Sequence, residues 1–169
     1  MKENISNTEL DVAQEFLEQS IPIRGTFITT VTRADGSVER KALPNVVMAD
    51  GLNHLADRAT ADAGSRYDWI AIGSATHTPH INSQYIAESH RKQCAICENS
   101  YELIVAIATW GGAADSVTSV QLEMAAIANH GTSGSGHYLN TANGLSTVLA
   151  DSDFLHLEVQ VRVGSHAIA

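Results

Sequence analysis

The segment from residue 154 to residue 163 constrains the fold most, because apolar and polar side chains alternate along it. One set of alternate positions is apolar and the other is polar: Leu155, Leu157, Val159, Val161 and Val163 against His156, Glu158, Gln160 and Arg162. Successive side chains of a β-strand point to opposite faces of the sheet. The pattern therefore predicts a strand that buries one face in a core and exposes the other to solvent.

Six other segments also have strand character, since they are rich in apolar and β-branched residues and are bounded by turn residues. They are residues 24–33, 38–47, 67–73, 102–110, 117–128 and 137–145. The first two flank an Asp-Gly turn at 34–37 and are expected to form a hairpin. Pro44 has no backbone N–H to donate, so the second strand is predicted to end there or to lie at a sheet edge.

Helical patterns are short and few. Residues 50–58 place two leucines on one side, behind Asp50 as a capping residue, which predicts a helix. Residues 84–91 are expected to form one or two helical turns. Neither segment is long enough to be the main element of the fold.

The first twenty residues have the character of a separate arm. An amphipathic helix is predicted over residues 9–18 and ends before Pro22. A helix of about ten residues is marginally stable alone. Its apolar residues Val12, Phe16 and Leu17 are therefore expected to dock on another surface, and they are candidates for an interface.

Together these segments predict a mainly β protein. The expected architecture is a jelly-roll-like antiparallel β-sandwich of residues 21–169, with short helices and the N-terminal arm of residues 1–20. The connections between the predicted strands are rich in Gly, Asp and Asn. A parallel sheet would instead need a helix of substantial length between successive strands.

The charge balance and the apolar runs exclude two classes of partner. Ten basic residues against nineteen acidic ones give a formal net charge of −9, which disfavours binding to a phosphate backbone. The longest apolar stretches, such as residues 103–108, are far shorter than the roughly 20 residues of a membrane helix. The polar N-terminus has no signal-peptide pattern. We therefore expect no nucleic acid, no membrane, and synthesis in the cytoplasm.

The spacing His90-x-x-x-Cys94-x-x-Cys97 is the most metal-like in the chain, because an imidazole and two thiolates can supply three zinc ligands. A fourth ligand is missing, and in an extended segment the two cysteines would point to opposite faces. Packed thiols are the expected state, since cysteine usually behaves as a small buried hydrophobe. A metal site and a redox pair are the alternatives.

His77 and His80 lie in a polar loop, residues 74–83, on either side of Pro79. A metal site or a pH-responsive site is one interpretation of this pair. The expected one is a surface loop that contacts another subunit, so both histidines are interface candidates.

Motifs that mark an enzyme are missing from the sequence. The glycine-rich residues 131–136 lack the lysine of a phosphate-binding loop, and there is neither a Gly-x-Ser-x-Gly elbow nor a His-Glu-x-x-His pair. We therefore predict a protein that is not an enzyme and uses no cofactor and no metal.

Six short motifs follow one another along the chain. They are Gly-Thr-Phe at 25–27, Arg-Ala-Asp-Gly at 33–36, Asn-Val-Val at 45–47, Gly-Leu-Asn-His-Leu-Ala-Asp at 51–57, Ala-Ile-Gly at 71–73 and Ala-Thr-Trp at 108–110. In these motifs and their order the chain resembles a family of small structural proteins of tailed bacteriophages, the capsid decoration and tail-fibre-like proteins. The likeness spans residues 21–165, but the family's Glu-Ala-Gly-Ile-Phe-Asn strand is matched only loosely at 123–129.

The resemblance implies a virion protein that is assembled in the host cytoplasm. The first hypothesis is a capsid decoration or cement protein, a homotrimer on the capsid surface that bridges subunits of the major capsid protein and uses its arm as a clamp. The alternative is a tail- or fibre-associated adaptor that meets its partner through residues 74–83 and 129–136. A second alternative, of another class, is a small cupin-like metalloenzyme with His77, His80 and His90 as ligands.

Overall fold

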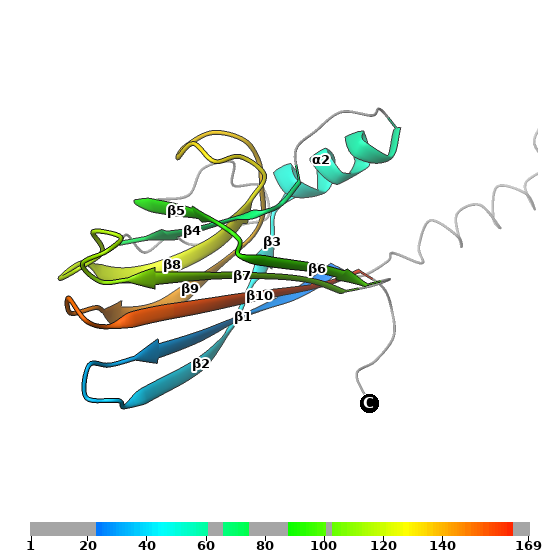
Figure 1. Ribbon diagram of the computed structural model, residues 1–169. Coiled ribbons are helices and arrows are strands. Elements are labelled where there is room, and N and C mark those ends of the chain that lie inside the picture. The colour runs from blue at the N-terminus through cyan, green and yellow to red at the C-terminus, as the bar shows by residue number, and fades with distance from the viewer. Residues whose placement is uncertain (1–22, 61–65, 75–87, 101–102, 164–169) are drawn as a thin grey trace, which may run out of the picture.

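The computed structural model describes residues 23–60, 66–74, 88–100 and 103–163 (Figure 1). Within these ranges the chain forms ten strands and one helix. In chain order they are β1 (Ile23–Thr32), β2 (Val38–Pro44), β3 (Val46–Val47), α2 (Ala49–Thr60), β4 (Trp69–Gly73), β5 (His90–Gln93), β6 (Ile96–Ser100), β7 (Leu103–Gly111), β8 (Gln121–Ala128), β9 (Tyr138–Val148) and β10 (Phe154–Val163).

The strands form two five-stranded antiparallel sheets. Sheet A has the order β2-β1-β10-β7-β6 and sheet B has the order β3-β9-β8-β4-β5. The two sheets pack against each other as a sandwich, with α2 beside one end of sheet B (Figure 1). The predicted antiparallel β-sandwich is confirmed, whereas the finer expectation of a jelly roll is not.

Two strand pairs pass from one sheet to the other at the edges of the sandwich. β2 continues into β3 through Asn45, and β5 continues into β6 through Cys94 and Ala95. At the second crossing the amide of Cys94 donates to Asp68 O at 2.8 Å, while the next amide donates to Ile107 O at 2.8 Å. If each pair is counted as one strand, the eight resulting strands form a ring in which every strand has two neighbours.

The core lies between the sheets and follows the alternation of the sequence. Leu155, Leu157, Val159 and Val161 of β10 are completely buried, as predicted. They pack in one cluster with large side chains of the other strands, chiefly Phe27, Trp110, Ile70, Ile127 and Leu139. His156, Glu158, Gln160 and Arg162 lie on the outer face and are half-buried. Burial of the apolar side chains between the sheets stabilises the sandwich by roughly 1.5–3 kcal/mol per large side chain.

Sheet B is also buried on its outer face. Ala71, Met124, Ala126 and Ala128 form a second cluster there with Met48 and Tyr138. At Gly51 the helix α2 approaches β9 so closely that a Cβ atom would lie 2.4 Å from Leu139 Cα. Only glycine permits this approach, and it fixes α2 against the sheet.

Most predicted elements are present with small shifts at their ends. The hairpin turn has Gly36 at φ 84° and is closed by a 2.8 Å hydrogen bond from the Ser37 amide to Asp35 Oδ1. β2 ends at Pro44 and is a sheet edge, and α2 covers the predicted helix. The helical turns expected over residues 84–91 are wrong at their end, because residues 90 and 91 belong to β5.

Candidate interaction site

The interface residues predicted from the sequence, Val12, Phe16, Leu17, His77 and His80, all lie outside the described residues. His90 lies in β5, where its Nδ1 is 2.9 Å from Ser89 Oγ. Cys94 is half-buried at the sheet crossing and packs against the main core. The side chain of Cys97 lies outside the description. The structure therefore leaves the arm and the 74–83 loop as predictions.

The connection between β8 and β9, residues 129–137, projects from one end of the sandwich beside α2 (Figure 1). We call it the β8–β9 loop. Residues 130–134 are exposed, and Gly134 and Gly136 have φ angles of 72° and 76°. At Gly136 a Cβ atom would also lie 2.4 Å from Asn129 Oδ1. Glycine is therefore required there twice, for the backbone angle and for the close approach.

A buried ion pair supports the backbone of the β8–β9 loop. Arg91 of β5 and Glu88 form two parallel hydrogen bonds, Nη2 to Oε1 at 2.6 Å and Nε to Oε2 at 3.0 Å. Their side chains are only 2% and 1% exposed. A charge pair this deep is stable only if its remaining donors and acceptors are also satisfied.

The β8–β9 loop supplies those remaining partners. The second terminal nitrogen of Arg91 donates to the carbonyl oxygens of His130 and Ser135, the latter at 3.0 Å. Glu88 Oε1 accepts from the amide of Gly134 at 2.6 Å. The ion pair thus holds the loop at three points of its backbone, so the loop conformation is fixed by the scaffold.

Tyr138 completes the network at the start of β9. Its hydroxyl accepts from Arg91 Nη2 at 2.8 Å and donates to Glu88 Oε1 at 3.1 Å. The guanidinium also lies 5.3 Å from the centre of the phenol ring. Burial, followed by the negative charge of Glu88, raises the pKa of Tyr138 to about 12. The hydroxyl therefore stays protonated as the donor to Glu88.

Asn129 fixes the first residue of the loop. Its Oδ1 accepts from the amide of His137 at 2.7 Å, which leaves Nδ2 pointing at His54 Nε2, 2.9 Å away. An amide nitrogen only donates, so His54 Nε2 is the acceptor and carries no proton in this arrangement. The buried ring of His54 stacks on that of His137, with centroids 4.7 Å apart.

The neighbouring pair of Asp50 and His137 has the geometry of an acid–base dyad. Asp50 Oδ1 lies 2.8 Å from His137 Nδ1. A hydrolase would need a hydroxyl or thiol at the other side of the imidazole. Within the described residues no serine, threonine or cysteine side chain is hydrogen-bonded to His137. The pair instead ties α2 to the end of the loop.

Trp69 supports the loop by apolar contact. A Cβ atom at Gly131 would lie 2.7 Å from Cζ2 of the indole, so the loop backbone rests directly on the ring. The loop is therefore held by a buried ion pair, by Asn129 and by an aromatic surface. Exposed loops on a rigid scaffold are where binding residues concentrate in proteins.

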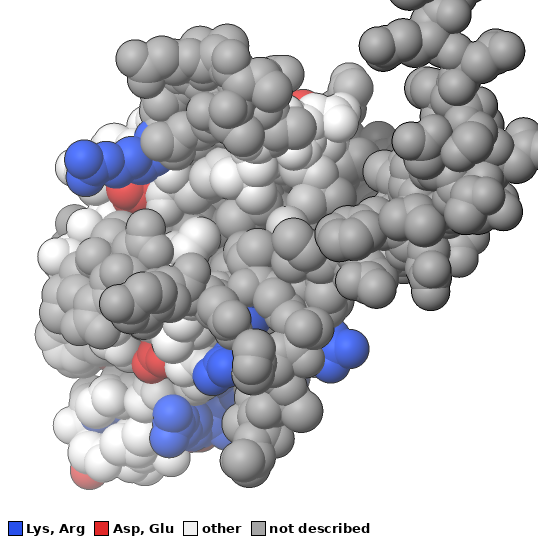
Figure 2. Space-filling view, turned by 90° about the vertical axis from the view of Figure 1, so that its right-hand side faces the viewer, with Lys and Arg blue, Asp and Glu red and all other residues white. Residues whose placement is uncertain are grey.

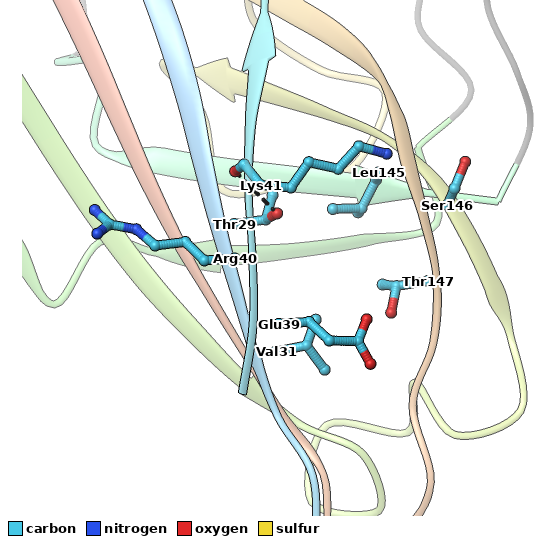
Figure 3. A pocket seen from close by; sticks show the side chains of 8 residues that line it. All are labelled: Thr29, Val31, Glu39, Arg40, Lys41, Leu145, Ser146 and Thr147. Atoms are coloured by element: carbon cyan, nitrogen blue, oxygen red, sulfur yellow. Dashed lines mark hydrogen bonds between the residues drawn. The ribbon is translucent and has the colours of Figure 1, made fainter. Parts of the chain in front are cut away.

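A shallow groove of about 220 Å³ lies between β2 and β9, away from this loop (Figure 3). Small-molecule sites usually have volumes of about 300–1,000 Å³. Glu39 and Lys41 point toward β9 across the groove, whereas Arg40 points away from it (Figure 3). Lys41 Nζ donates to the carbonyl of Gly144 at 2.5 Å. The groove is thus a seam between the sheets that side chains bridge.

Arg33 closes the same seam at its end. It donates to Val148 O at 2.6 Å and to Asp153 Oδ2 at 2.9 Å, and it also pairs with Glu39. Hydrogen bonds from the amide of Ala150 and from Arg33 hold the pKa of Asp153 below its usual value. The network joins the β1–β2 turn to the β9–β10 turn and has a structural role.

The described ranges contain no group of three His, Cys, Asp or Glu side chains placed to hold a metal ion. In those ranges no helix has the length and hydrophobicity needed to cross a membrane. Two of the three histidines of the metalloenzyme hypothesis, at 77 and 80, lie outside them.

These features define a class of protein: a rigid antiparallel β-sandwich that presents one braced loop at its end. No protein family, no curated protein and no solved structure matches the chain. The sequence reasoning found the loop as an exposed glycine-rich segment but missed Glu88, Arg91 and Tyr138. The one local signal was the spacing of Glu88 and Arg91, three residues apart.

Proposed function

We propose that this chain is a non-enzymatic structural protein of a tailed-bacteriophage particle, a cement protein that bridges neighbouring major capsid protein subunits. The observation that supports it most is the braced β8–β9 loop. Glu88, Arg91, Tyr138 and Asn129 order the loop before any partner binds, so little conformational entropy is lost on docking. A preordered contact loop of this kind is expected in a small domain whose function is adhesion.

The resemblance motifs support the proposal at the level of shape. Gly25 admits two asparagine side chains, since a Cβ atom there would lie 2.6 Å from Asn45 Nδ2 and 2.7 Å from Asn140 Nδ2. Arg33 closes the seam, Gly51 seats α2 on β9, and Trp110 fills the core. The motifs that this chain has in common with phage structural proteins therefore occur at positions with a physical role in the sandwich.

Many weak contacts would reinforce a shell in this function. Each copy adds a few kcal/mol of interface energy, and separation of the shell requires that many such contacts break together. In this proposal the outer side chains of residues 130–134 form the surface of each copy that contacts the capsid. The domain then holds neighbouring subunits together.

The test uses particles of the phage whose genome encodes the chain. Particles assembled without the protein should release their DNA at a lower temperature, and addition of the purified protein should restore the wild-type temperature. Replacement of the exposed Thr132 and Ser133 by lysine should abolish this restoration while the protein stays folded. The matched control replaces the exposed Ala113 and Ala114 at the other end of the sandwich by lysine and should restore fully.

A tail or fibre adaptor is the second candidate, because a single braced loop also suits a contact made once per tail. Quantitative mass spectrometry of purified particles separates the two: a cement protein is present in many copies and an adaptor in few. Equal stability of particles with and without the protein would refute the cement role.

A further inference from the structure

Three arginines lie without an ionic partner on the outer face of sheet A. Four other described cations are engaged: Arg33, Arg91 and Lys92 form ion pairs, and Lys41 binds a carbonyl. Arg24, Arg40 and Arg162 make no hydrogen bond or ion pair in the part of the chain that the structure describes. We call the outer side of β2, β1, β10 and β7, where they lie, the arginine face.

The strand register places two of these charges together. Arg24 of β1 lies directly opposite Arg162 of β10. Like charges opposite each other on neighbouring strands destabilise a sheet. The strand register places two described carboxylates on this side of sheet A: Glu158, which is hydrogen-bonded to Gln160, and Glu98 of β6, opposite Val105. Repulsion between Arg24 and Arg162 therefore destabilises the fold, and an anionic partner that binds to both would remove this effect.

The third arginine extends the positive face along the sheet. Arg40 of β2 lies opposite Thr30, which in turn lies opposite His156. Figure 2, which looks at the end of the sandwich on the right of Figure 1, shows Lys and Arg side chains in the lower half of the molecule and also at its upper left. Among the described residues, the three arginines of this face are cations without an ionic partner on a chain whose formal net charge is −9.

Apolar side chains lie between the charges. Ile28, Ile107 and Val105 are half-buried on this face, and Phe154 is 53% exposed. The strand register puts Ile28 and Ile107 on either side of Glu158. The face thus fits a segment that is acidic and apolar at the same time.

The N-terminal segment of this chain has that composition. Residues 1–20 contain five carboxylates against one lysine, which leaves a net charge of −4, and they include the apolar residues Val12, Phe16 and Leu17. The charge of this segment is opposite in sign to that of the arginine face. The same segment is present in every copy of the chain, so a second copy can supply it.

We propose that the arginine face binds residues 1–20 of a second copy of this chain. The acidic side chains of the segment approach Arg24, Arg40 and Arg162, and its apolar side chains cover Ile28 and Ile107. The inference does not depend on the phage proposal, because it concerns contacts between copies alone. On a capsid it would link neighbouring copies into a network.

The test is a charge-reversal exchange in the full-length protein. The face-reversed variant carries Arg40→Glu and Arg162→Glu, and the second change places a carboxylate opposite Arg24, which favours folding. The arm-reversed variant carries Glu9→Lys, Asp11→Lys and Glu15→Lys. Sedimentation velocity at low ionic strength, about 0.05 M, reports association, since salt screens exposed charges.

The wild-type protein should self-associate. The association constant of each reversed variant should be lower by at least about tenfold. An equimolar mixture of the two variants should regain association. The acidic segment of the face-reversed variant can bind the arginine face of the arm-reversed variant, and the basic segment of the latter can bind the acidic face of the former. Arg66→Glu, a change at an exposed arginine away from this face, should leave association unchanged. A wild-type protein that stays monomeric, or a mixture that does not reassociate, overturns the proposal. Particle binding that persists in the face-reversed variant would leave the cement proposal intact while this one fails.

Discussion

Val159 of β10 lies directly opposite Phe27 of β1, and neither side chain is exposed to solvent. The next residue, Gln160, lies opposite Thr26 on the other face, where both are half-buried. One position along the strand therefore separates the core from the outer surface. The difference can be tested by substitution at two adjacent residues.

We predict that Val159→Asp prevents folding. The carboxylate would be buried without a partner among the core side chains, at a cost of several kcal/mol against a typical total stability of roughly 5 to 15 kcal/mol. Gln160→Lys should change the free energy of unfolding by no more than about 0.5 kcal/mol. Urea unfolding followed by circular dichroism measures both. A folded Val159→Asp protein beside an unfolded Gln160→Lys protein would mean that the two faces are reversed.

Arg91→Met should destabilise the protein by about 3–5 kcal/mol, because it leaves the charge of Glu88 buried and unpaired. Hydrogen exchange at the amide of Gly134 should accelerate, since its acceptor loses its anchor. Lys92→Met is the matched control: its ion pair with Asp115 is 41% and 25% exposed and is worth at most about 1 kcal/mol. Equal effects of the two changes would show that the buried pair does not brace the loop.

Alkaline titration should show Tyr138 as a late-titrating phenol. Its folded-state pKa of about 12 lies above the unfolded value of about 10. The neutral phenol thus stabilises the fold fully below about pH 10, and this contribution is lost as the pH rises from there through about 12. Absorbance at the phenolate band should show a late-titrating group that Tyr138→Phe removes. Its persistence in that variant would assign the late group to another tyrosine.

Asp153→Asn should weaken the closed seam at neutral pH. The pKa of Asp153 is lowered in the folded state, so its carboxylate stabilises the fold above the unfolded value of about 3.9 and this contribution is lost as the pH falls through the lower folded value. The difference in urea midpoint between wild type and variant should therefore shrink on acidification. Asp151→Asn, an exposed neighbour in the same turn, should show no such difference. A gap that stays constant down to low pH would contradict the assignment.

The parts of the fold that were predictable have a local cause. The alternation in β10, the Asp-Gly turn at 34–37 and the spacing of leucines in α2 each follow from side-chain periodicity or backbone preference. Pro44 predicted a sheet edge because a residue without a backbone N–H cannot donate a hydrogen bond to a neighbouring strand. Strands β5 and β6 were missed because His90–Gln93 has no apolar alternation, and its extended form is set by pairing with β4.

The braced loop was unpredictable for a different reason. Arg91 and Tyr138 are far apart in the sequence, and nothing near either residue indicates that the guanidinium is buried. Charged residues are usually placed on the surface from sequence, since they are seldom fully buried unless paired. Here the pairing depends on the return of the chain in β9, a long-range contact that a local pattern does not report.

The pairing of β1 with β10 along their full lengths has a consequence for synthesis. The first strand has its partner on one side in β2, which follows at once, but its other partner emerges from the ribosome only after nearly all of the domain has been made. Sheet A cannot close until β10 has been made, and translation proceeds at about 5–20 residues per second. Contacts between strands so distant in the chain also make folding slow. The nascent chain therefore passes through a period in which the inner faces of β1 and β7 are uncovered, and chaperones that shield apolar strands would act in that interval.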